Sequence, residues 1–130
     1  MLWFSKAKRK DIWDDPVEEQ LGDIEAAQKI RAICRTAADS AEKVGTADGR
    51  SPTKLQPDRD RYERAAKAAM AIAMKISDEL VRDSAVCEIV GLCMKANNIK
   101  TARALFRAIH AASIKAEVLK ENPTLEGEQG

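Results

Sequence analysis

The stretch that decides the fold is Tyr62–Leu119, YERAAKAAMAIAMKISDELVRDSAVCEIVGLCMKANNIKTARALFRAIHAASIKAEVL, which matches itself at a constant offset of 33 residues. The paired positions, alike in residue type, are Ala69 and Ala102, Ala71 and Ala104, Ile72 and Leu105, Ile76 and Ile109, Arg82 and Lys115, and Ala85 and Val118. A period in the thirties is typical of helix–turn–helix repeats, in which each hairpin buries its apolar face against the next. The stretch therefore predicts helical hairpins.

The composition of the whole chain supports the same fold class. The chain has 130 residues, of which 45% are hydrophobic, 33% are charged and only 4% are aromatic. This balance is that of one globular domain, and abundant alanine with few β-branched runs favours helix. The formal net charge of +1 gives no global field that would attract a nucleic acid or a membrane. The composition therefore predicts an all-α domain.

Periodicity and capping residues predict the helices and their boundaries. An arm over residues 1–15 precedes a single helical domain over 16–121, which a linker loop interrupts at 45–57, and a disordered tail follows at 122–130. Gly22 and Asp23 interrupt the first apolar stripe, so either one helix runs from Pro16 to about Val44 or Asp23 caps a new one; the repeat pattern favours the break. Further helices are expected over 58–76, 79–95 and 99–120, which gives four to five helices in all. The helix over 79–95 is the most apolar and is expected at the centre.

The phrase AIAMKISDELVRDSAV, residues 71–86, resembles a degenerate tetratricopeptide-type hairpin. The resemblance spans residues 24–119 and implies a stack of hairpins that serves as a protein-binding scaffold. A four-helix bundle explains the same periodicity equally well, so both packings stay open. The resemblance assigns no binding residue to this chain.

The N-terminal arm departs from the rest of the chain in composition. Three of the five aromatic residues lie within its first thirteen residues, together with a run of basic side chains. Apolar area next to positive charge suits a protein groove or, weakly, an anionic membrane surface. The alternative is that the aromatic rings fold back and cover the end of the helical stack. The predicted partner-binding residues are Trp3, Phe4, Lys8, Arg9, Lys10 and Trp13.

No residue cluster predicts catalysis, a cofactor or a metal. His110 is the only histidine, and the three cysteines form no CxxC pair, which favours free thiols and a cytoplasmic location. We therefore expect a non-catalytic protein–protein interaction or adaptor module, with an unidentified protein partner and a possible homodimer. The alternative is a nucleic-acid-binding module that uses the basic residues near the N-terminus and in segment 50–67, although acidic residues interleave with the latter.

Overall fold

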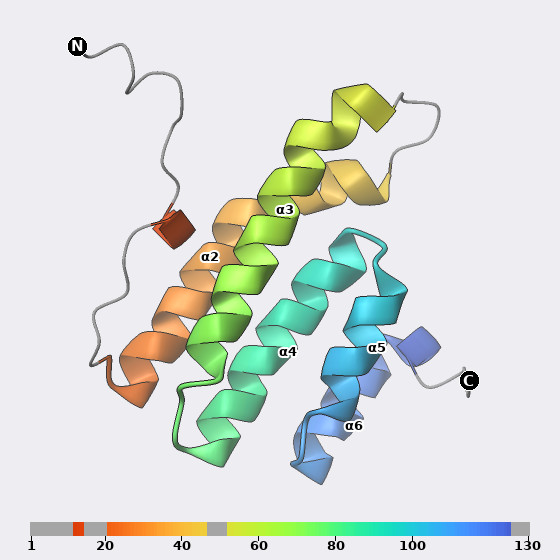
Figure 1. The fold of residues 1–130 in the computed structure, drawn as a ribbon. Helices are drawn as coiled ribbons and strands as arrows, with labels where there is room; N and C mark the ends of the chain where they lie inside the picture. The colour runs from red at the N-terminus through yellow and green to blue at the C-terminus, as the bar shows by residue number, and fades with distance from the viewer. Residues whose placement is uncertain (1–11, 15–20, 47–51, 126–130) are drawn as a thin grey trace, which may run out of the picture.

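The computed structural model describes residues 12–14, 21–46 and 52–125, and every regular element in these ranges is a helix (Figure 1). This confirms the predicted all-α class, with five α-helices in the described ranges. The elements are a short 3-10 helix η1 (Ile12–Asp14), α2 (Asp23–Gly45), α3 (Pro52–Ala73), α4 (Glu79–Lys95), α5 (Ile99–Arg107), α6 (Ala112–Glu121) and a second 3-10 helix η2 (Pro123–Leu125).

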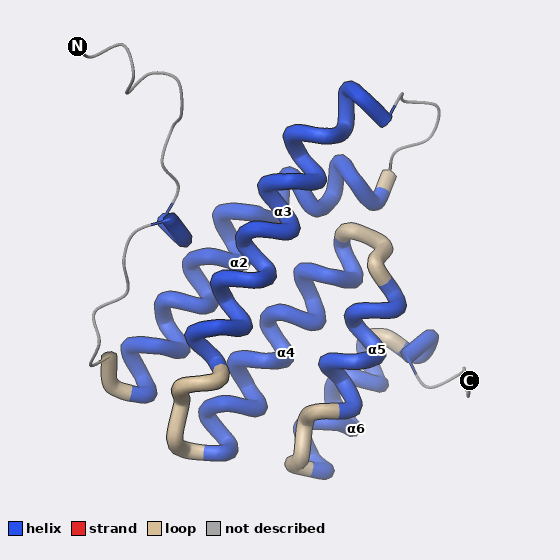
Figure 2. Tube along the Cα trace, viewed as in Figure 1, coloured by secondary structure: helices blue, strands red, loops and turns tan. Residues whose placement is uncertain are grey.

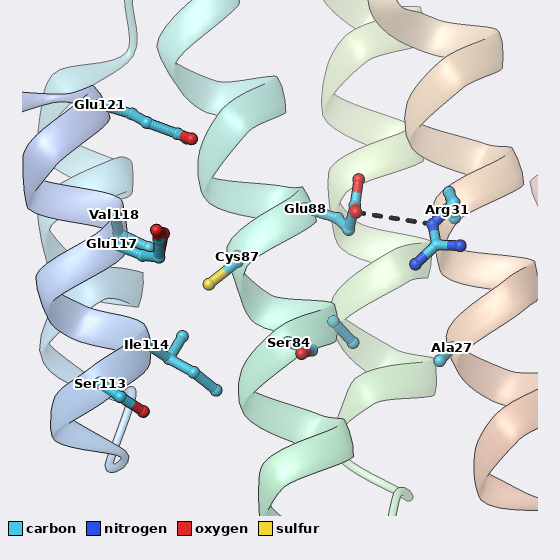
Figure 3. A pocket seen from close by; sticks show the side chains of 11 residues that line it. Ala27, Arg31, Ser84, Cys87, Glu88, Ser113, Ile114, Glu117, Val118 and Glu121 are labelled. Carbon is cyan, nitrogen blue, oxygen red and sulfur yellow. Dashed lines mark ion pairs between the residues drawn. The ribbon is translucent and has the colours of Figure 1, made fainter.

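The helices form two layers, with α2, α4 and α6 in one and α3 and α5 in the other (Figures 2 and 3). Helix α4 is central, because it packs against α2, α3, α5 and α6. Its core side chains include Ile89, Leu92 and Cys93, which are at most 2% exposed. A helix that is apolar on all sides must be covered on several sides, and the chain covers α4 in this way.

Local capping explains where α2 and α4 begin. Helix α2 starts after Gly22, whose N–H donates to the Glu25 Oε1 at 3.0 Å. The predicted break at Gly22 is therefore correct, but Asp23 does not cap its own helix. Its carboxylate instead accepts hydrogen bonds from the N–H groups of Ser77 (3.0 Å) and Asp78 (2.8 Å), which lie just before α4.

Both ends of α4 are set by residues next to them in the sequence. Asp78 caps the start of α4 by accepting from the Val81 N–H at 3.0 Å. At the other end Asn97 adopts a positive φ of 60°, a conformation that asparagine tolerates better than most residues. Asn98 then caps α5 by accepting from the Thr101 N–H at 3.3 Å. This turn is where the sequence predicts it.

The predicted linker over 45–57 is too long, because Gly45 is the last residue of α2 and α3 already begins at Pro52. Proline is well tolerated at the first position of a helix, whereas Pro57, the sixth residue of α3, removes one hydrogen bond within the helix. Leu55 lies between the two prolines and is 4% exposed. Burial of the Leu55 side chain favours the helical turns that precede the predicted start at residue 58.

The helix predicted over 99–120 is also wrong, since the chain turns at residues 108–111 and continues as α6. The cause is a long-range contact: the buried Asp83 of α4 accepts hydrogen bonds at Oδ2 from the N–H groups of His110 (3.1 Å) and Ala111 (2.9 Å). Helix α6 begins 33 residues after α4, the same offset that relates the paired sequence positions.

The predicted disordered tail begins too early. Asn122 is the C-cap of α6, and η2 follows it over Pro123–Leu125. Leu125 is 4% exposed, and the guanidinium of Arg103 donates to the Thr124 carbonyl oxygen at 2.9 Å. These contacts hold the segment against the domain through residue 125.

Candidate interaction groove between α2, α4 and α6

The layer of α2, α4 and α6 carries a hollow along its outer face (Figure 3). It consists of two adjoining cavities of about 440 and 360 Å³, which share Cys87, Glu88 and Glu121 in their linings. Helix α4 forms the floor, and α2 and α6 form the two walls. We refer to the two cavities together as the groove. Its size lies in the range of clefts that bind ligands in proteins.

The two walls carry opposite charges. Helix α2 contributes Arg31 and Arg35, which are four residues apart and so lie on one face of the helix. Helix α6 contributes Glu117 and Glu121, which share the same spacing and project toward α4 in Figure 3. The groove is therefore basic along one wall and acidic along the other.

Ion pairs leave part of this charge uncompensated. Arg31 pairs with Glu88 of the floor, with Nε and Oε2 3.6 Å apart. Within the residues that the structure describes, Arg35, Glu117 and Glu121 take part in no ion pair or side-chain hydrogen bond. One basic and two acidic side chains around the groove are thus available to a molecule that enters it.

A row of small residues runs along the floor of the groove, beside the larger Glu88, Leu92 and Lys95. Ser84, Cys87 and Gly91 of α4 follow one another at helical spacing along it. Apart from its chain neighbours and the adjoining backbone of α4, no described atom lies within 4 Å of a Cβ atom built on Gly91, so packing among the described residues does not require a glycine here. Glycine inside a helix costs about 0.5–1 kcal/mol relative to alanine. Gly91 therefore weakens α4, and no contact with the described residues accounts for it.

The thiols at the groove are not prepared for nucleophilic chemistry. Burial, assisted by the nearby carboxylates of Asp83, Glu88 and Glu121, raises the pKa of Cys87 from 9.0 to about 11. Burial likewise raises the pKa of Cys34 from 9.0 to about 12. Reactive cysteines have lowered pKa values, because the thiolate is the attacking species. These cysteines act as small apolar side chains.

The raised thiol pKa values predict a loss of stability in alkali. The folded chain holds these protons more tightly than the unfolded chain, so their contribution is fully present below pH 9.0 and is lost as the pH rises toward about 12. Urea titrations at a series of pH values should show a free energy of unfolding that falls above about pH 9. Cys34→Ala should reduce that slope. An absorbance titration in which the folded thiols ionise near pH 9 would contradict the prediction.

Of the predicted partner-binding residues, the structure describes only Trp13; Trp3, Phe4, Lys8, Arg9 and Lys10 lie outside the described residues. The Trp13 side chain is 7% exposed, and the guanidinium carbon of Arg61 lies 5.1 Å from its ring centroid. The Lys29 Nζ also donates to the Ile12 carbonyl oxygen at 3.2 Å. Trp13 thus packs on the domain, as the alternative interpretation of the arm expects.

The other sequence candidates are held by internal contacts. Arg61, part of the basic segment 50–67, donates to the Thr36 carbonyl oxygen (3.3 Å) and to the Ser40 Oγ (3.1 Å). The Nδ1 of His110 lies 2.6 Å from the Glu79 Oε2. No group of three or more possible metal ligands occurs among the described residues.

Sequence reasoning did not find the groove, since its lining residues come from three helices that are far apart in the chain. Two features hinted at it: a glycine inside the most apolar helix, and glutamates four residues apart at the end of the domain.

None of the described helices combines the length and apolar character needed to cross a membrane. No family model, curated protein or solved structure matches this chain.

Proposed function

We propose that the chain is a protein-interaction module and that a segment of its partner binds in the groove between α2, α4 and α6. The observation that carries the proposal is Gly91, a helix-interior glycine with open space above it on the floor of the groove. Glycine is used where another backbone or a ligand comes close to the chain. A partner segment that lies against α4 at Gly91 gives this residue a role that internal packing does not.

The charges of the groove fit a polypeptide better than other ligands. The lining carries three carboxylates (Glu88, Glu117 and Glu121) and three cations (Arg31, Arg35 and Lys95), so a phosphate backbone gains no net attraction, and an apolar ligand would leave the charges unmatched. A polypeptide carries side chains of both signs and so can match both walls. The homodimer and the nucleic-acid alternative remain predictions, which no described contact supports.

Substitutions at Gly91 separate a structural role from a binding role. Gly91→Ala should raise the free energy of unfolding by about 0.5–1 kcal/mol, because alanine favours the helix and its Cβ enters open space. Gly91→Leu should leave the fold intact and fill the floor of the groove. Urea denaturation measures both effects, and a destabilised Gly91→Ala variant would show that the glycine serves the fold.

Binding is measured with peptides selected from a phage-displayed helical library on the full-length chain. Peptides that bind in the groove should lose affinity for the Gly91→Leu variant. The matched control is Ala104→Leu, which adds the same side chain at an exposed position of α5 outside the groove. Selected peptides that bind both variants as well as the natural chain would place the interaction elsewhere and overturn the proposal.

A further inference from the structure

The arrangement of charges on the two walls of the groove specifies the kind of segment that fits it. We infer that the partner segment is an amphipathic helix that carries lysine or arginine residues four apart on the edge facing α6 and an acidic residue on the edge facing α2. The inference rests on the proposed function, and adds to it the chemistry and orientation of the partner.

The acidic wall sets the spacing of the cations on the partner. Glu117 and Glu121 are exposed, lie one helical turn apart on α6 and have no ion-pair partner in the described part of the chain. Repulsion between two such carboxylates is relieved by a partner with cations at the same spacing. Residues four apart on a docked helix have that spacing.

The basic wall and the floor determine the other edge of the partner helix and how closely it can approach α4. Arg35 faces the groove from α2 without an ion-pair partner in the described ranges, whereas Arg31 is already paired with Glu88. One acidic side chain at the level of Arg35 is therefore enough on that edge. The small floor at Ser84, Cys87 and Gly91 lets a helix axis come close to α4, since the distance between packed helices depends on the side chains at their contact.

The test is a second selection from the phage-displayed helical library, with the full-length chain and its Glu117→Lys/Glu121→Lys variant as targets. The natural chain should enrich peptides with basic residues four apart, and the variant should enrich peptides with acidic residues at those positions. Peptides selected on the natural chain should bind the variant at least about tenfold more weakly, and added salt should reduce the difference. Circular dichroism should show equal helix content, because both glutamates are exposed.

Controls separate this inference from the proposed function. Glu63→Lys reverses an exposed charge on α3, in the other layer, and should leave binding unchanged. Peptides that fail on Gly91→Leu yet show no charge preference, and bind Glu117→Lys/Glu121→Lys normally, would overturn the charge pattern while the groove remains the binding site. Peptides that tolerate Gly91→Leu, or a selection that enriches no peptide, would overturn both.

Discussion

Replacing Gly45 by alanine is expected to lower the free energy of unfolding by about 3 kcal/mol, the upper end of the usual cost of overpacking a tight contact. Gly45 ends α2 where this helix crosses the C-terminal end of α4. A Cβ atom there would overlap the carbonyl oxygen of Lys95 and would lie only 3.1 Å from its carbonyl carbon. These are backbone atoms, which cannot rotate away as the end of a flexible side chain can.

The chain can relieve this overlap only by separating the two helix ends. That separation would weaken the contact in which the Lys95 Nζ lies 3.9 Å from the Glu42 Oε2, and it would expose the half-buried Val44. Urea denaturation of Gly45→Ala beside Gly91→Ala provides the measurement and its control, since the same substitution meets open space at Gly91. Equal effects at the two positions would show that the last turn of α2 moves aside at little cost.

The sequence predicts best those features that depend on neighbouring residues. The ends of α4 follow from Asp78 and Asn97, which act within one turn of their own positions. The start of α2 follows from Gly22 for the same reason. The central position of α4 follows from its apolar composition on all sides. In each case the residues that determine the structure adjoin the structure they determine.

The predictions that are wrong concern features set by distant residues. The linker prediction counted prolines and glycines, but α3 begins early because Leu55 finds a buried place in the folded domain. The break between α5 and α6 has no turn residues of its own, and it is held by hydrogen bonds to Asp83 on another helix. The groove is the same kind of feature, because three helices must assemble before Arg35, Gly91 and Glu121 line one surface.

The hydrogen bonds that hold the turn before α6 lead to the second large effect. Asp83→Ala is expected to lower the free energy of unfolding by about 3–6 kcal/mol, because it removes two hydrogen bonds and each hydrogen bond to a charged group contributes about 1.5–3 kcal/mol. The substitution leaves the N–H groups of His110 and Ala111 without their acceptor, and Asp83 itself is only 1% exposed. Asp83→Asn keeps an acceptor oxygen and should cost less. Urea denaturation measures both variants.

Two other aspartates provide a graded control for Asp83. Asp78 accepts a single hydrogen bond, from the Val81 N–H on the surface, so Asp78→Ala should cost about 1 kcal/mol, the usual loss of an N-cap. Asp23 accepts two hydrogen bonds, from Ser77 and Asp78, but is only half-buried, so Asp23→Ala should lie in between. If Asp83→Ala cost no more than Asp78→Ala, the turn before α6 would not depend on α4. A larger loss would mean that one buried carboxylate of α4 stabilises the turn from which α6, the helix that carries Glu117 and Glu121, begins.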